Sequence, residues 1–176
     1  LAPADRDLFR QLAVFVGGFD LEAAEAVVTP ARDVLGGLVR LVDRSLVLTD
    51  PRPDGPMRYR VLEPVRRFGL HALCTEGPGP EAARRRHAEH VRSLARRCDP
   101  FGLGGESPRG PFARAVEDEA NLLAAVDWAR DQPGDLGLRV CVAAAALFEL
   151  RGPLVDGRAR IEAALATGTE DLDLHL

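Results

Sequence analysis

The stretch VLGGLVRLVDRSLVLTD, residues 34–50, changes its hydrophobic period halfway along. Up to Arg44 its apolar residues recur at helical spacing, whereas Ser45 to Thr49 is short, apolar and rich in β-branched residues. Arg58 to Leu62 alternates well enough to pair with this segment across the turn-rich residues 50–56. The stretch therefore predicts a helix, opened by Thr29-Pro30, that leads into a β-hairpin. The stripe expected to be buried on this helix comprises Val34, Leu35, Leu38, Val39 and Val42.

Two further helices are expected upstream of this stretch. In residues 5–16, Leu8, Leu12 and Phe15 share one helical face, and the left-handed conformation of Gly17-Gly18 is expected to end the helix. Asp20 is the predicted N-cap of a short second helix that ends at Val28.

Downstream, a fourth helix is expected from Glu63 to Leu73, with Val65, Phe68 and Ala72 facing inward. Three helices, a hairpin and a closing helix follow the order of a winged helix-turn-helix. We therefore interpret residues 1–76 as an α+β winged-helix domain.

The remainder of the chain is expected to be all-α, so that the fold class is mainly α. Residues 77–111 are interpreted as a linker helix, 81–98, followed by a glycine-rich loop, 100–111. In residues 112–176 we expect helices at 112–130, 136–150 and 154–165, the start of a helical-hairpin region like tetratricopeptide repeats. Ala88, Val91 and Leu94 are expected to give the linker helix only a thin apolar seam.

The composition disfavours two classes of protein, dedicated nucleic-acid binders and membrane proteins. All 23 basic residues are arginines, and the formal net charge is −4, which disfavours a dedicated nucleic-acid binder. Three widely spaced cysteines, the absence of a secretory signal and the short apolar runs predict a cytoplasmic chain without a membrane segment. Because the chain begins at Leu1 rather than methionine, we interpret it as an excised piece of a longer protein.

No motif predicts catalysis, so we expect this chain not to be an enzyme and to hold no cofactor. It has no phosphate-binding loop, and the paired glycines at 17–18 and 36–37 are interpreted as sites of helix termination and close packing. His87, His90 and Cys98 offer too few ligands for a structural metal site, so the histidines are interpreted as part of a solvated helix face. The basic run at 84–97 is interpreted as the solvated side of a linking helix. Its alternative is contact with phosphate or with an acidic partner.

A DNA-binding winged helix is the alternative function. It would read the major groove with the helix of residues 34–43, and its wing would touch the backbone. Against it, residues 1–76 hold ten arginines and eleven acidic residues, a net charge of −1. The DNA-contact candidates under this alternative are Arg32, Arg40, Arg44 and Arg58.

A set of motifs in order and spacing resembles one known family. In the winged-helix part these are LFRQLAVFVGGF (8–19), EAAEAV (22–27), LVRLVDRSLV (38–47) and RYRVLEPVRRF (58–68). Beyond it they are RRRHAEH (84–90), EANLLAAVDW (119–128) and LFELRG (147–152). Together they resemble the LuxR- and SARP-type (AfsR-like) bacterial regulators of the STAND class of signalling ATPases.

The resemblance implies a non-catalytic regulatory module. In that class an NB-ARC-like module that binds ATP or ADP with Mg²⁺ precedes the winged helix, which clamps it, and helical repeats follow as a scaffold for sensing or partners. Where eukaryotic relatives have a Met-His-Asp motif, this chain reads Val61-Leu62-Glu63. Glu63, Arg66 and Arg67 are therefore the predicted switch-interface residues. A plain protein-interaction scaffold is a third interpretation that the sequence leaves open.

Overall fold

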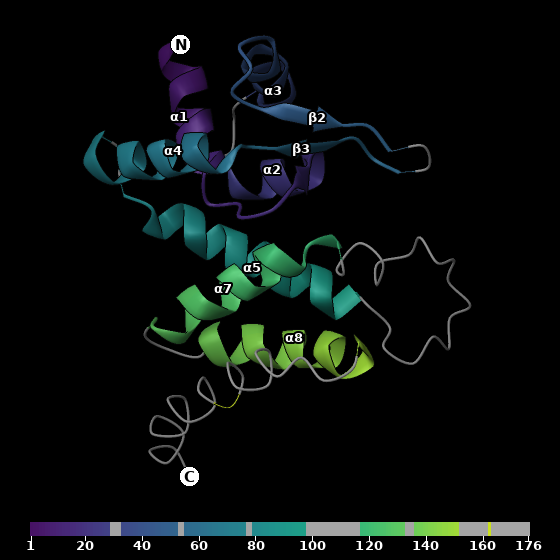
Figure 1. The fold of residues 1–176 in the computed structure, drawn as a ribbon. Helices are drawn as coiled ribbons and strands as arrows, with labels where there is room; N and C mark the ends of the chain where they lie inside the picture. The colour runs from purple at the N-terminus through teal and green to yellow at the C-terminus, as the bar shows by residue number, and fades with distance from the viewer. Residues whose placement is uncertain are drawn as a thin grey trace. The chain divides into compact units, whose positions relative to one another are not determined.

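The computed structural model describes residues 1–28, 33–52, 55–76, 79–97, 117–132, 136–151 and 162, with only the backbone for residues 144–151. The chain divides into two compact units, Leu1–His87 and Ala88–Leu176. Helices dominate and a small three-stranded sheet lies in the first unit, so the mainly-α fold class is confirmed (Figure 1). The elements are α1 (Pro3–Leu12), β1 (Phe19–Asp20), α2 (Leu21–Val27), α3 (Val34–Asp43), β2 (Leu48–Asp50), β3 (Arg58–Arg60), α4 (Glu63–Glu76), α5 (Glu81–Arg97), α7 (Glu119–Arg130) and α8 (Leu136–Arg151).

The first helix is shorter than predicted. It begins at Pro3, which suits the first turn because proline lacks a backbone N–H, and it ends at Leu12 rather than at residue 16. The expected left-handed glycines are also wrong, because Gly79 is the glycine with a positive φ among the described residues. Gly18 is small for another reason. A Cβ there would lie 3.3 Å from the Arg58 side chain and from the Tyr59 carbonyl oxygen.

The predicted hairpin is confirmed, and a third strand joins it. The sheet order is β1-β3-β2 and both pairings are antiparallel. The two-residue strand β1 was not predicted. Its Asp20 pairs with Arg58 and is also the N-cap of α2, where Oδ1 accepts a hydrogen bond from the Ala23 N–H at 2.9 Å. The predicted cap at Asp20 is therefore confirmed, and the same residue belongs to the sheet.

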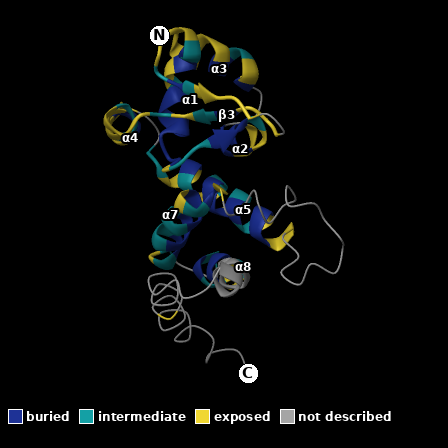
Figure 2. Ribbon diagram, turned by 45° about the vertical axis from the view of Figure 1, so that its right-hand side comes forward, coloured by how far each residue is buried: buried dark blue, intermediate teal, exposed yellow. Residues whose placement is uncertain are grey.

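The core of the first unit consists of buried apolar residues from α1 to α4, from the sheet region and from the first turn of α5. Figure 2 colours the buried residues dark blue. Phe15 and Phe19 stack with ring centroids 4.6 Å apart, and Tyr59 continues the stack from β3 at 6.0 Å. The largest fully buried side chains of this core include Leu12, Phe19, Val27, Leu38, Leu41 and Leu73. Burying such side chains is the main favourable term in folding.

Helix α4 packs on α1 with a different face from the one predicted. Ala72 is buried and Val65 is half-buried, but Phe68 is 67% exposed, so its predicted inward position is wrong. Gly69 occupies the contact instead, since a Cβ there would lie 2.9 Å from the Cβ of Ala13. Neighbouring helical residues point about 100° apart, so the glycine contact turns the preceding phenylalanine outward.

In the second unit, the later turns of α5 share a core with α7 and α8. These turns supply Ala88, Val91, Leu94 and Ala95, all buried, so the expectation of a thin seam is wrong. Helices α7 and α8 pack against each other, and Gly137 allows their close approach. A Cβ at this position would lie 2.6 Å from the Ala129 carbonyl oxygen. The predicted loop at 100–111 and the predicted helix at 154–165 lie outside the described residues, apart from Glu162.

Candidate functional site

The helix-turn-helix consists of α2 and α3, and α1 holds it in place. Helix α3 begins after Asp33, whose Oδ1 accepts a hydrogen bond from the Gly36 N–H at 2.9 Å, whereas the predicted start at residues 29–30 lies outside the described residues. Gly37 lets α3 approach α1, since a Cβ there would lie 2.2 Å from Cδ2 of Leu8. The side chains that α3 buries are Val34, Leu38 and Leu41.

The outer face of α3 carries two large apolar residues. Leu35 is 50% exposed and Val39 is 52% exposed, so their predicted burial is wrong. They lie one helical turn apart, beside the buried stripe, and so form one exposed apolar patch. A helix that reads bases presents polar and cationic groups at such positions. This patch suits contact with protein better than contact with DNA.

Arg40, a predicted DNA contact, is held within the domain. Its Nε donates a hydrogen bond at 2.9 Å to Oδ1 of Asp5, a residue of α1 that is buried. A second acidic group, Asp33, lies 3.7 Å from the same guanidinium. The hydrogen bond from Arg40 and its positive charge lower the pKa of Asp5. Arg40 therefore joins α3 to α1 and is paired with acidic groups of the domain, although 48% of its side chain is exposed.

The end of α3 is a Schellman motif built without glycine. Ser45 has φ of 58°, in the left-handed region. Its N–H bonds the Val42 carbonyl at 2.8 Å, and the N–H of Leu46 bonds the Leu41 carbonyl at 3.0 Å. Arg44, another predicted DNA contact, is the C-cap and is exposed. Arg32, the third candidate, lies outside the described residues.

Arg58 of the wing, which was predicted to contact DNA, is buried. Arg58, the fourth candidate for DNA contact, is only 5% exposed, and its guanidinium donates a hydrogen bond to the Gly18 carbonyl at 2.7 Å. Its predicted contact with a DNA backbone is therefore unsupported, because Arg58 lies on the central strand β3 and its side chain is buried. Arg52 is more exposed and lies 3.6 Å from Asp50.

The predicted switch residues lie in the first turns of α4. Arg66 binds Glu63 through two hydrogen bonds, at 2.7 and 3.0 Å, and also donates to the Ala13 carbonyl at 3.3 Å. The hydrogen bond from Arg66 lowers the pKa of Glu63. Arg67 is exposed. The structure thus joins two of the three residues into one pair, next to the exposed Leu62 in the chain.

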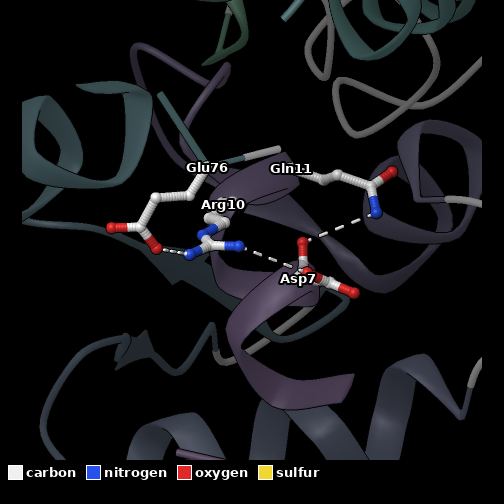
Figure 3. Close-up of polar contacts among 4 residues, drawn as sticks. All are labelled: Asp7, Arg10, Gln11 and Glu76. Carbon is white, nitrogen blue, oxygen red and sulfur yellow. Dashed lines mark hydrogen bonds and ion pairs between the residues drawn. The ribbon is translucent and has the colours of Figure 1, made fainter. Parts of the chain in front are cut away.

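A polar cluster between α1 and α4 was not anticipated from the sequence (Figure 3). Arg10 is only 6% exposed, forms an ion pair with Glu76 at the end of α4, and lies 3.5 Å from Asp7. Gln11 donates to the Asp7 carbonyl at 3.5 Å. Because Arg10 and Glu76 are 66 residues apart, no local pattern could have revealed their pairing.

Two residues of the basic run at 84–97 contact other residues of the first unit. His87 is 3% exposed and meets the Phe15 ring edge-on, with centroids 5.0 Å apart, so its predicted place on a solvated face is wrong. Arg86 donates hydrogen bonds to the Val27 carbonyl and to Oε1 of Gln11. Both residues lie in the first two turns of α5, which complete the first unit.

No group of three or more potential metal ligands occurs among the described residues. Burial raises the pKa of the Cys141 thiol to about 11, so at neutral pH it is a packed thiol rather than a nucleophile. Within the described residues, no helix is both long and apolar enough to cross a membrane.

Residues 1–74 match the family described as "Winged helix-turn-helix domain". The chain is 38% identical over 135 residues to "Putative HTH-type transcriptional regulator Rv0890c" of Mycobacterium tuberculosis and, equally, to its counterpart Mb0914c of Mycobacterium bovis. That match covers 74% of this chain and 15% of each regulator. "Uncharacterized protein Rv0894" of M. tuberculosis is 35% identical over 97 residues, 52% of this chain and 24% of that protein.

No solved structure matches the chain significantly. The order of helices, the antiparallel wing and the family match agree with one another. Residues 1–74 are therefore a winged helix-turn-helix domain, carried by a chain that is homologous to those mycobacterial proteins.

Proposed function

We propose that this chain is a non-catalytic regulatory module of a STAND-type ATPase that regulates transcription. In this proposal the winged helix is an intramolecular clamp on a nucleotide-binding module, and the helices from α5 onward are a scaffold for sensing or for protein partners. The names of the mycobacterial relatives support a role in transcription. Nucleotide and Mg²⁺ would bind the neighbouring module and not this chain.

One observation favours a clamp over a DNA reader. Helix α3, which enters the major groove in DNA-binding relatives of this fold, exposes Leu35 and Val39. Its central arginine, Arg40, is bound to Asp5. A DNA phosphate that approached this face would meet apolar side chains and an arginine that is already paired with Asp5. A protein surface would gain from burying both apolar side chains.

The clamp requires an interface that can open, because a switch works by moving between two packed arrangements. Glu63, Arg66 and Arg67 remain the proposed interface residues at the start of α4. Reversing the charge of Arg67, the exposed member, should raise the basal activity of the whole regulator without unfolding the domain. The matched control is reversal of Arg85, an exposed arginine on α5. Equal basal activity in both variants would remove α4 from the interface.

DNA binding is the second candidate, favoured by the helix-turn-helix itself and by the exposed Arg44. The deciding experiment is a fluorescence anisotropy titration of a labelled duplex with the 176-residue chain at roughly 50 mM salt. The clamp predicts a flat titration. Saturable binding that weakens steeply as salt is raised, and that is lost in Arg44→Glu, would replace the clamp with direct DNA recognition.

A further inference from the structure

The first two turns of α5 are built into the winged-helix core, beyond the residues that match the family. Ala83 is 2% exposed and belongs to the same apolar cluster as Leu12 and Val27. His87, one turn further along the same face, lies against the Phe15 ring. The helix-turn-helix therefore rests on α5 as well as on α1.

Helix α2 has few means of its own to hold its C-terminal end. It is only seven residues long, it has no basic residue in its last turn, and its C-cap Val28 is followed by a threonine and not by a glycine. Isolated helices of this length are unstable in water, and the last carbonyls of any helix lack partners within it. A side chain from elsewhere in the chain can therefore supply a partner for a carbonyl at the end of α2.

Arg86 is that side chain. Its Nε donates to the Val27 carbonyl, the last residue of α2, across 59 residues of sequence. One of its terminal nitrogens donates to Oε1 of Gln11 on α1 at 3.0 Å. A guanidinium at a helix C-terminus also interacts favourably with the helix dipole. One side chain of α5 thus ties the end of α2 to α1.

We propose that Arg86 is a latch through which α5 controls the helix-turn-helix. When the first turns of α5 are docked, Arg86 fixes the end of α2, the helix that precedes α3 in the helix-turn-helix. When they lift away, α2 loses its C-terminal partner and the position of α3 is released. Because α5 also supplies Val91 and Leu94 to the second core, a rearrangement of that core would act on the latch. The inference does not depend on what α3 contacts.

The test is amide hydrogen exchange on the full 176-residue chain with Arg86→Ala. We expect exchange in residues 24–28 to accelerate about tenfold, the effect of losing charge-assisted hydrogen bonds. Exchange in β2, β3 and the α1–α4 contact should stay the same. Arg85→Ala, the neighbouring exposed arginine, is the matched control and should leave α2 unchanged. Equal exchange of α2 in the two variants would overturn the latch.

A second variant tests whether Arg86 acts through the docking of α5 or only through its own hydrogen bonds. Ala83→Glu places a carboxylate at a buried position and should lift the first turns of α5. The latch predicts accelerated exchange in α2 and little further acceleration when Arg86→Ala is added, whereas fully additive effects contradict it. If Ala83→Glu removes protection throughout the first unit, Arg86→Lys decides instead. Lysine reaches only one of the two acceptors well, so intermediate exchange supports the latch and exchange like that of the unmodified chain overturns it.

Discussion

Arg40 reaches the same oxygen of Asp5 with two of its nitrogens, Nε at 2.9 Å and a terminal nitrogen at 2.8 Å. The two residues are 35 positions apart and join α3 to α1. One of the four candidates for DNA contact under the alternative function thus links two helices of the domain. A candidate binding residue must be tested for intramolecular partners before its charge is assigned to a ligand.

The first prediction concerns acid stability. Arg40 lowers the pKa of Asp5, so its carboxylate contributes stability that is complete above the unfolded-state pKa, near pH 4, and is lost as the pH falls through the lower folded-state value. Asp5→Asn should reduce the free energy of unfolding at pH 7 and flatten its decline below about pH 4. Urea unfolding at a series of pH values measures both effects. Glu25→Gln, at an exposed position on α2, is the control, and identical acid limbs in the two variants would contradict the prediction.

The second prediction concerns the end of α3. Ser45 holds φ of 58°, which costs a residue with a Cβ about 1 kcal/mol, and its side chain is exposed. Ser45→Gly should therefore raise the free energy of unfolding by roughly 0.5–1 kcal/mol. Ser45→Ala keeps the strain and should give no gain. Denaturant unfolding compares the three chains, and a gain in the alanine variant as large as in the glycine variant would rule out strain as the cause.

The third prediction concerns the contact between α1 and α3. Gly37→Ala places a Cβ 2.2 Å from Leu8, in a packed core, and should cost about 1–3 kcal/mol despite the better helix propensity of alanine. Leu8→Val, which removes the atom in the way, should recover part of that loss in the double variant. Gly55→Ala, where the nearest atom is 3.7 Å away, should be nearly neutral. Thermal unfolding of the four chains checks the series, and additive effects of the two core changes would contradict it.

The fourth prediction concerns the outer face of α3. Leu35→Ser with Val39→Ser should change the free energy of unfolding by no more than about 1 kcal/mol, since both side chains are half exposed. Leu38→Ala, on the same helix but fully buried, should cost about 2–5 kcal/mol. If the patch is the clamp surface, the double serine variant should raise basal activity in the whole regulator. Unchanged activity with an intact fold would exclude the patch from the interface.

Local periodicity was sufficient to predict most of the elements of the first unit. It placed α3 and the hairpin, and the cap at Asp20 was confirmed by its hydrogen bond. It could not tell which of two adjacent apolar residues faces the core, so Leu35 and Phe68 were predicted to be buried and are exposed. The neighbouring helix decides that choice, and its approach depends on residues such as Gly69, far away in the sequence.

The polar contacts were harder to predict than the elements. Asp5 with Arg40, Arg10 with Glu76, and Arg86 with the Val27 carbonyl each join residues at least 35 positions apart. Charge patterns inform about neighbours on one helix but not about partners that tertiary packing brings together. For that reason a basic run was assigned to solvent although Arg86 turns into the domain. The sequence held no signal that could have separated this arginine from Arg85 beside it.

The double role of Asp20 has a consequence for protein engineering. One residue is both the edge-strand partner of Arg58 and the cap of α2, so the wing and the helix-turn-helix share a fixed joint. A chimaera that takes its wing from another protein would pair a foreign central strand with the native Asp20, which still caps α2. Such grafts should succeed only when residues 18–20 and the strand of Arg58 are transplanted together.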